Sequence, residues 1–353
     1  MMDAAALKEK SMQAIKSFGL PRLIITLFLV LLFIIAPFAK VNIASGISDM
    51  LTRFGMNAVL VLAMVPMVHS GCGLNFGLPL GIISGLLGAT MTIEFGFTGF
   101  SSFLMAIVFA TPFAIILGAG YGALLNRVKG GEMMIATYVG FSSVAFMCIM
   151  WLLLPYDNPT MVWGYAGTGL RTTISVEGAY LGVLDNFLRI KIGHLAIPTG
   201  TILFFAFLSL LIWFFLRTKT GTAMTAVGSN PIFATASGVS VDRMRTLSVI
   251  LSTWLGAVGI IVYEQSFGFI QLYMGPFNMA LPAVSAVLLG GASVNKASIA
   301  NVVIGTLLFQ GILTMTPSVM NGLIQMDVSE VIRIIVSNGM ILYALTRKQE
   351  VTR

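Results

Sequence analysis

The stretch RTKTGTAMTAVGSNPIFATASGVSVDRMR, residues 217–245, lies between two long apolar runs and contains few large side chains. Four basic residues bracket it: Arg217, Lys219, Arg243 and Arg245. Lys and Arg gather in loops on the cytoplasmic face of membrane proteins. The chain is therefore expected to cross a bilayer on both sides of this segment.

The middle of the segment carries the signals of a short helix. Asn230 can cap a helix amino terminus, Pro231 fits the first helical position, and Gly238 suits the position just past the carboxyl end. These residues predict a helix of about two turns. The small residues before it predict a compact cytoplasmic surface that a partner protein could grip. An ordinary connecting loop is the alternative.

Composition gives the class of protein. Apolar residues make up 57% of the 353 residues and charged residues only 9%, whereas soluble domains average roughly one half and one quarter. The mean hydropathy is +0.96. Apolar runs recur from residue 23 to residue 346 without a long polar block. These features predict a polytopic membrane protein with no separate soluble domain.

The predicted fold is an all-α membrane bundle. Since a span needs about 20 apolar residues, the chain divides into a cytoplasmic segment 1–22, a membrane domain 23–346 and a cytoplasmic tail 347–353. Ten spans are predicted, at 23–39, 54–70, 76–94, 100–125, 133–155, 197–216, 246–266, 281–294, 298–317 and 330–346.

Lys and Arg residues between the spans predict the orientation. With the amino terminus in the cytoplasm, fourteen of them fall on the inner face and five on the outer face, among them Lys40 and Arg53. This excess follows the positive-inside rule, so both termini are predicted to be cytoplasmic. It also accounts for the net charge of +7 without a nucleic-acid partner.

Two apolar segments suggest an internal repeat. FGLPLGIISGLLGA at 76–89 and MALPAVSAVLLGGA at 279–292 align at a constant offset of 203 residues. They fall in the third and eighth predicted spans, so an inverted repeat of five plus five spans would explain them; chance similarity is the alternative. Such repeats place the transport pathway where interrupted helices meet. The predicted pathway residues are Asn75, Phe76, Gly77, Pro79, Pro282 and Ser285.

Other candidate sites are scarce. The glycines at 73, 77, 81 and 85 favour close helix packing over a phosphate loop, because no Lys-Ser/Thr pair follows them. Glu94 and Glu264 fall near the outer ends of their spans, where they can reach the interface, so structural or interfacial roles are expected for them. The sequence shows no catalytic constellation, no metal cluster and no acidic or His residue near mid-span. An enzyme and an ion-coupled transporter therefore fit it less well.

The segment 217–245 resembles the coupling segment of ribose, xylose and galactose type permeases of ABC importers, a family that includes nucleoside and branched-chain amino acid permeases. AVLLGGASV at 286–294 is similar to a second hallmark of the family, and IGTLLFQGILT at 304–314 follows it. The residues that match the coupling pattern are Thr218, Gly221, Ala226, Val227, Gly228, Asn230, Pro231, Ala234, Gly238 and Val239.

The resemblance implies a mechanism and its partners. Two permease chains, identical or homologous, would form the pathway in a bacterial cytoplasmic membrane. Two cytoplasmic ATPase subunits would grip the short helices, and an extracytoplasmic binding protein would deliver a small solute. This chain has no Gly-x-x-x-x-Gly-Lys-Ser/Thr motif, so we expect ATP to bind the ATPase subunits and this chain to hold no cofactor and no metal.

The resemblance leaves the solute open. Sugar permeases of this family commonly carry an acidic segment at the start of the third span, whereas this chain reads Gly-Leu-Asn-Phe-Gly at 73–77. A monosaccharide such as ribose or galactose ranks first, a nucleoside second and a branched-chain amino acid third. The outer segment 156–195 is long enough to dock the binding protein, although its aromatic residues could instead anchor at the membrane interface. These aromatics are Trp163, Tyr165, Tyr180 and Phe187.

Overall fold

The computed structural model describes residues 20–162 and 169–324, together with isolated positions from 331 to 342. The helices are α2 (Leu20–Ile35), α3 (Ile43–Leu62), α4 (Met64–His69), α5 (Leu78–Glu94), α6 (Gly99–Arg127), α7 (Glu132–Leu153), α8 (Thr199–Arg217), α9 (Lys219–Ser229), α10 (Pro231–Ala236), α11 (Val241–Phe267), α12 (Gly275–Leu289) and α13 (Ile299–Ile324). The short strands are β1 (Thr173–Ser175), β2 (Ile190–Ile192), β3 (Leu195–Ile197) and β4 (Phe269–Gln271), which pair antiparallel as β1 with β4 and β2 with β3.

The helices confirm a polytopic membrane architecture. Within the described residues, six helical segments are long and apolar enough to cross a bilayer: α3 with α4, α6, α7, α8, α11 and α13. The shorter apolar helices are α2, α5 and α12. Each of the first nine predicted spans overlaps one of these helices. The tenth, 330–346, falls largely outside the described residues, as do the terminal segments, so the count of ten and the domain limits stay predictions.

Helix α3 begins well before the predicted span at 54–70. Its start is polar, which hides it from a hydropathy criterion, but Asn42 caps it by accepting a hydrogen bond from the backbone N–H of Ala44 at 2.9 Å. The cap gives a hydrogen-bond acceptor to one of the backbone N–H groups of the first turn, which have no partner within the helix. The polar first turns of α3 consequently become part of the folded helix.

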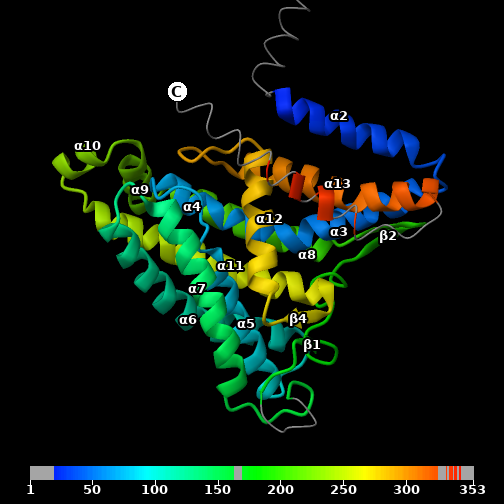
Figure 1. The fold of residues 1–353 in the computed structure, drawn as a ribbon, viewed down its shortest axis with the longest axis horizontal. Coiled ribbons are helices and arrows are strands. Elements are labelled where there is room, and N and C mark those ends of the chain that lie inside the picture. The colour runs from blue at the N-terminus through cyan, green and yellow to red at the C-terminus, as the bar shows by residue number, and fades with distance from the viewer. Residues whose placement is uncertain are drawn as a thin grey trace, which may run out of the picture.

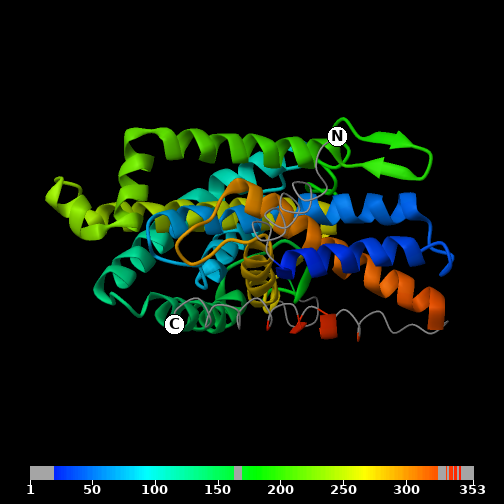
Figure 2. The ribbon, with the colours of Figure 1, turned by 90° about the horizontal axis from the view of Figure 1, so that it is seen from above.

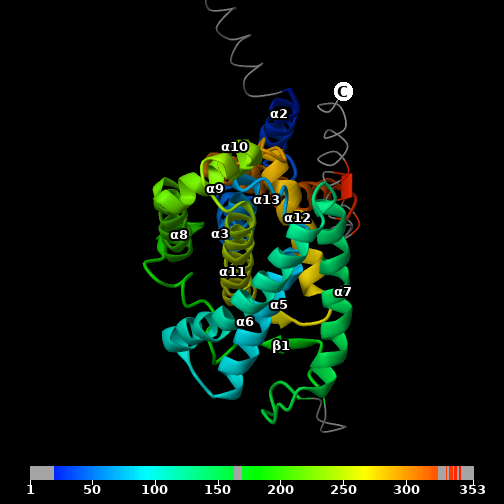
Figure 3. The ribbon, with the colours of Figure 1, turned by 90° about the vertical axis from the view of Figure 1, so that its left-hand side faces the viewer.

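Helix α11 is the centre of the bundle and contacts α3, α4, α5 and α6. Figure 3 shows it between α8 on one flank and α7 on the other. A Cβ atom at Gly81 would lie 2.5 Å from the carbonyl oxygen of Thr253, and one at Gly85 would lie 2.5 Å from that of Ala257. The predicted packing role of these two glycines is confirmed, because α5 and α11 approach backbone to backbone.

The outer helices of the bundle expose apolar surface. In the most apolar window of α7 only 22% of the residues are buried, against 78% for α3 with α4. Because an apolar face of this extent is unfavourable in water, α7 is suited to lipid or to another membrane subunit.

The two segments proposed as a repeat differ locally. Pro79 lies in the first turn of α5, directly after a break in the chain's helical path, whereas Pro282 lies inside α12. A proline in the first turn costs no hydrogen bond, but one inside a helix removes one. The inverted repeat stays a prediction.

Candidate functional site

Helices α9 and α10 follow α8 and lie at one end of the molecule. Figures 1 and 2 place α10 at the opposite end from the β2–β3 hairpin along the long axis. The predicted cap is present, since the side chain of Asn230 accepts a hydrogen bond from the N–H of Phe233 at 3.0 Å and Pro231 is the first residue of α10. Gly238 follows the helix with a φ of 81°. The predicted short helix is confirmed.

The segment before α10 is itself a helix. Thr218 caps α9, because its hydroxyl accepts a hydrogen bond from the N–H of Gly221. The small residues of this segment were predicted to form a compact surface, but several of them face the bundle. Among the predicted coupling residues, the buried ones are Gly221, Val227 and Ala234, the half-buried ones are Ala226, Gly228 and Val239, and the exposed ones are Thr218, Asn230, Pro231 and Gly238.

Two large apolar side chains that were not predicted as site residues are exposed on α10. Ile232 is 83% exposed and Phe233 is 66% exposed, although the helix lies outside the apolar spans. Ala234 beside them is buried and anchors the helix. Exposed aromatic and aliphatic side chains on a capped, anchored helix form a surface suited to a protein partner. The sequence signal that could have identified this surface is a pair of large apolar residues within an otherwise small and polar segment.

Helix α9 packs against the break between α4 and α5. A Cβ atom at Gly228 would lie only 2.2 Å from the carbonyl oxygen of His69. The His69 ring also reaches α9, with Nδ1 at 3.3 Å from the hydroxyl of Thr225. Its Nε2 donates to the carbonyl of Ala297 at 3.0 Å. His69 therefore joins the broken helix both to α9 and to the loop that follows α12.

One face of α11 holds the same break from the other side. Arg245 Nε donates to Cys72 Sγ at 3.3 Å, and the hydroxyl of Ser248 donates to that of Ser70 at 2.6 Å. One turn further along, the hydroxyl of Ser252 accepts a hydrogen bond from Asn75 Nδ2 at 2.8 Å. Positions 245, 248 and 252 share one face of a helix. The break between α4 and α5 is thus bound by three successive turns of α11.

Two ion pairs join the α6–α7 connection to the start of α11. The Arg245 guanidinium lies 2.6 Å from the Glu132 carboxylate, and the two side chains are 9% and 17% exposed. Lys129 lies 3.4 Å from Asp242, but these side chains are 61% and 63% exposed. The N–H of Gly130 also donates to Glu132. Only the first pair is shielded from solvent, so it is the stronger link.

The predicted pathway residues lie in packed surroundings. Asn75 is fully buried, and its Oδ1 accepts a hydrogen bond from the Tyr121 hydroxyl at 3.3 Å. A Cβ atom at Gly77 would lie 2.5 Å from the Tyr121 ring. Ser285 is buried and donates to the carbonyl of Leu281, and Phe76 is half-buried. None of the predicted pathway residues lines the pocket described next.

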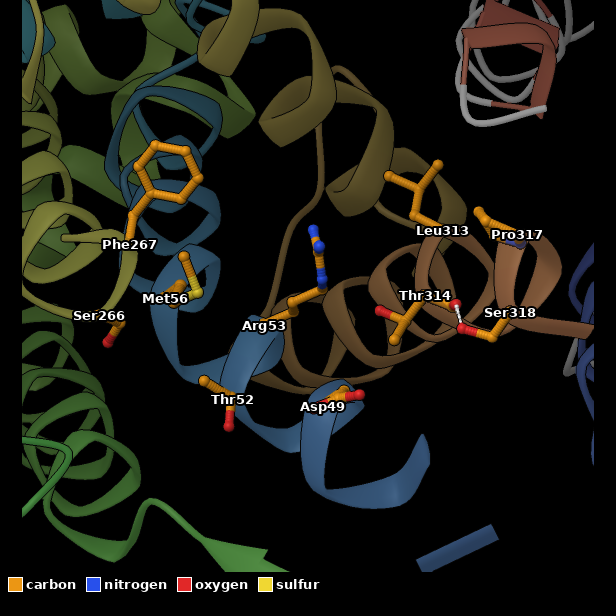
Figure 4. Close-up of a pocket in the computed structure, with 10 residues that line it drawn as sticks. All are labelled: Asp49, Thr52, Arg53, Met56, Ser266, Phe267, Leu313, Thr314, Pro317 and Ser318. Atoms are coloured by element: carbon orange, nitrogen blue, oxygen red, sulfur yellow. Dashed lines mark hydrogen bonds between the residues drawn. The ribbon is translucent and has the colours of Figure 1, made fainter. Parts of the chain in front are cut away.

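A pocket of about 520 Å³ opens between α3, α11 and α13. Figure 4 shows Arg53 extending from α3 into the space between Phe267 and Leu313. The pocket combines charged, hydroxyl and apolar side chains, which is the usual mixture in a site for a small polar molecule. Its lining residues are Asp49, Thr52, Arg53, Met56, Ser266, Phe267, Leu313, Thr314, Pro317 and Ser318.

The outer segment 156–195 contributes to the core as well as to the surface. Tyr180 is fully buried and donates a hydrogen bond to Glu264 at 2.7 Å, whereas Phe187 is exposed. Burial, and then the neighbouring Glu264 charge, raise the pKa of Tyr180 well above its usual value, so the phenol stays protonated. Glu264 is buried against Tyr180 and does not reach the interface, so it has the structural one of the two roles expected for it. Trp163 and Tyr165 lie outside the described residues.

A helical bundle with long apolar spans and a capped helix pair beyond them has the architecture of a polytopic membrane protein. Residues 46–345 match the family described as the permease component of branched-chain amino acid transport systems. The chain belongs to this family of ABC importer permeases.

The curated relatives are distant. The chain is 25% identical over 235 residues to the autoinducer 2 import system permease protein LsrD of Escherichia coli O157:H7, an alignment that covers 65% of this chain and 67% of that protein. The LsrD proteins of Escherichia coli K12 and Shigella flexneri are 25% identical over 227 residues, covering 63% of this chain and 65% of each relative. No solved structure matches the chain.

Proposed function

We propose that this chain is the permease subunit of an ATP-driven, binding-protein-dependent importer of a monosaccharide such as ribose or galactose. It works in the bacterial cytoplasmic membrane with both termini in the cytoplasm and pairs with a second, identical or homologous permease chain. Two cytoplasmic ATPase subunits bind and hydrolyse the ATP. An extracytoplasmic binding protein delivers the solute.

The observation that carries this proposal is the exposed apolar pair on α10. Ile232 and Phe233 lie on a helix outside the apolar spans, on the face that the charge distribution assigns to the cytoplasm. An ATPase subunit that buried them would gain hydrophobic free energy and a rigid contact. Movement of α10 would pass through α9 to the α4–α5 break, because Gly228 touches His69 there.

The monosaccharide assignment rests on the coupling and AVLLGGASV segments, which resemble those of sugar permeases. The relatives are named for import of autoinducer 2, and the family description names branched-chain amino acids. A branched-chain amino acid and a nucleoside are therefore the alternative solutes. An ion-coupled secondary transporter is the alternative from a different class of transport proteins.

The proposal is tested with proteoliposomes that contain the permease, its ATPase subunits and its binding protein. We expect uptake of D-ribose or D-galactose that requires ATP and persists when ion gradients are collapsed. Uptake of L-leucine or adenosine without either sugar would overturn the monosaccharide assignment. Gradient-driven uptake by this chain alone would overturn the importer mechanism.

The coupling surface is tested by replacing Ile232 and Phe233 together with Ser. We expect the affinity for the ATPase subunits to fall by roughly tenfold or more, because exposed aromatic and aliphatic anchors supply much of an interface's free energy. Co-purification and ATP-dependent uptake measure the effect. Ile192→Ser is the matched control, since Ile192 is 67% exposed at the opposite end of the molecule. Unchanged ATPase affinity in the double variant would show that α10 is not the contact.

A further inference from the structure

The pocket between α3, α11 and α13 lies toward the extracytoplasmic ends of these helices in the proposed orientation. Arg53 belongs to a segment that the charge distribution places outside, and Phe267 is the last residue of α11. A cavity of about 520 Å³ lies within the range of roughly 300–1,000 Å³ that small-molecule sites occupy. A solute arriving from outside would therefore meet this pocket early.

The charged groups of the pocket are balanced, and they have no partner among the residues that the structure describes. Asp49 and Arg53 are one helical turn apart on α3. Within the described part of the chain, neither side chain makes an ion pair or a hydrogen bond. Their charges cancel, so the pocket favours a solute with no net charge. The carboxylate accepts hydrogen bonds only and the guanidinium donates them only.

The hydroxyl groups of the pocket add acceptors. Thr52 donates its proton to the carbonyl of Ser48, Thr314 donates to that of Gln310, and Ser318 donates to that of Thr314. The protons of these three hydroxyls are therefore used within their own helices. The oxygen lone pairs that remain can accept hydrogen bonds from a solute.

An apolar wall completes the lining. Phe267 from α11 and Leu313 from α13 lie on either side of the extended Arg53 side chain (Figure 4). An aromatic ring offers a flat apolar face to the C–H groups of a sugar ring, while separate donors and acceptors bind its hydroxyls. The lining thus matches the two kinds of surface that a monosaccharide presents.

We propose that this pocket is a holding site for a neutral, polyhydroxylated solute of monosaccharide size on its way into the membrane domain. Arg53 donates to hydroxyl oxygens, Asp49 and the Thr and Ser oxygens accept from hydroxyl protons, and Phe267 covers the apolar face. The inference rests on the proposed function and assigns a site to its solute.

The first test measures ATP-driven uptake of D-ribose and D-galactose in the reconstituted importer. We expect Arg53→Gln and Asp49→Asn each to raise the KM for the sugar-loaded binding protein or to lower the maximal rate, with a loss of uptake efficiency of roughly tenfold, as for a lost hydrogen bond to a charged group. Lys40→Gln is the charge-matched control, because Lys40 is an exposed outer cation that does not line the pocket. Equal detergent melting temperatures and yields show that the variants fold.

The second test detects the solute in the pocket directly. Ser318→Cys in a Cys148→Ser background is labelled from outside with a membrane-impermeant thiol reagent, with and without D-ribose or D-galactose. We expect the sugar that is transported to slow labelling at least threefold at position 318, and not at Ser45→Cys, an exposed control on α3 outside the pocket. Slower labelling with L-leucine but neither sugar would overturn the chemical class proposed for the solute.

The outcomes separate the site from the function. If the wild-type importer takes up a sugar but both pocket variants match it and no sugar protects position 318, the pocket assignment is overturned and the proposed function stands. If the wild-type importer takes up neither sugar, the proposed function fails by itself. Sugar protection at position 318 with reduced uptake in both variants supports the site.

Discussion

Replacing Arg245 with Met is expected to lower the free energy of unfolding by about 3 kcal/mol or more, because it leaves the shielded carboxylate of Glu132 without its ion pair. It also removes the contact of α11 with Cys72 at the α4–α5 break. Unfolding in detergent micelles by titration with sodium dodecyl sulfate measures the change. We expect ATP-driven uptake to fall in parallel.

The neighbouring ion pair is the matched control. Lys129→Gln breaks a pair that joins the same two parts of the chain but is mostly exposed, so we expect a loss of about 1 kcal/mol or less. The double variant Arg245→Met with Glu132→Met removes both charges and should be more stable than Arg245→Met alone. Equal losses for Arg245→Met and Lys129→Gln would show that shielding does not decide the strength of the link.

Gly228→Ala is expected to reduce ATP-driven uptake to background, although alanine is the best helix former. A Cβ atom at this position would lie 2.2 Å from the carbonyl oxygen of His69, so α9 must move away from the break between α4 and α5. We expect ATPase subunits still to bind, because Ile232 and Phe233 stay exposed on α10. Uptake and co-purification are measured side by side.

Gly120→Ala controls for the substitution itself. Gly120 lies in α6, and no atom within 4 Å would meet its Cβ, so alanine there should be neutral or slightly stabilising. Wild-type uptake by Gly228→Ala would contradict the idea that α9 acts through this contact. Loss of uptake in Gly120→Ala would show that a glycine-to-alanine substitution in a helix abolishes uptake even without a close contact.

Local signals allowed α10 to be predicted from the sequence. Asn230, Pro231 and Gly238 act through the backbone of their own helix, and such short-range rules need no knowledge of the rest of the fold. The apolar spans could be predicted for a similar reason, since each reports its own hydropathy. The start of α3 was not predicted because Asp49 and Arg53 are polar, although they lie on a regular helix.

The candidate site could not be predicted in full from the sequence, because it is formed by contacts between distant parts of the chain. Asn75 looked suited to a solute, but Ser252 and Tyr121 bind its amide in the core. Gly228 was predicted to be part of a compact cytoplasmic surface, yet it packs against the backbone of His69. The pocket brings Arg53 together with Phe267 and Thr314 from two other helices. No spacing of residues within the sequence predicts contacts between such distant helices.

The way α10 is held has an evolutionary consequence. Asn230 fixes the start of this helix and Ala234 fastens it to the bundle, so the side chains at 232 and 233 contribute little to its folding. Those two positions are consequently free to change together with the ATPase subunit that we propose contacts them. A lineage could come to use a different ATPase subunit by substituting these two residues while the rest of the permease stayed unchanged.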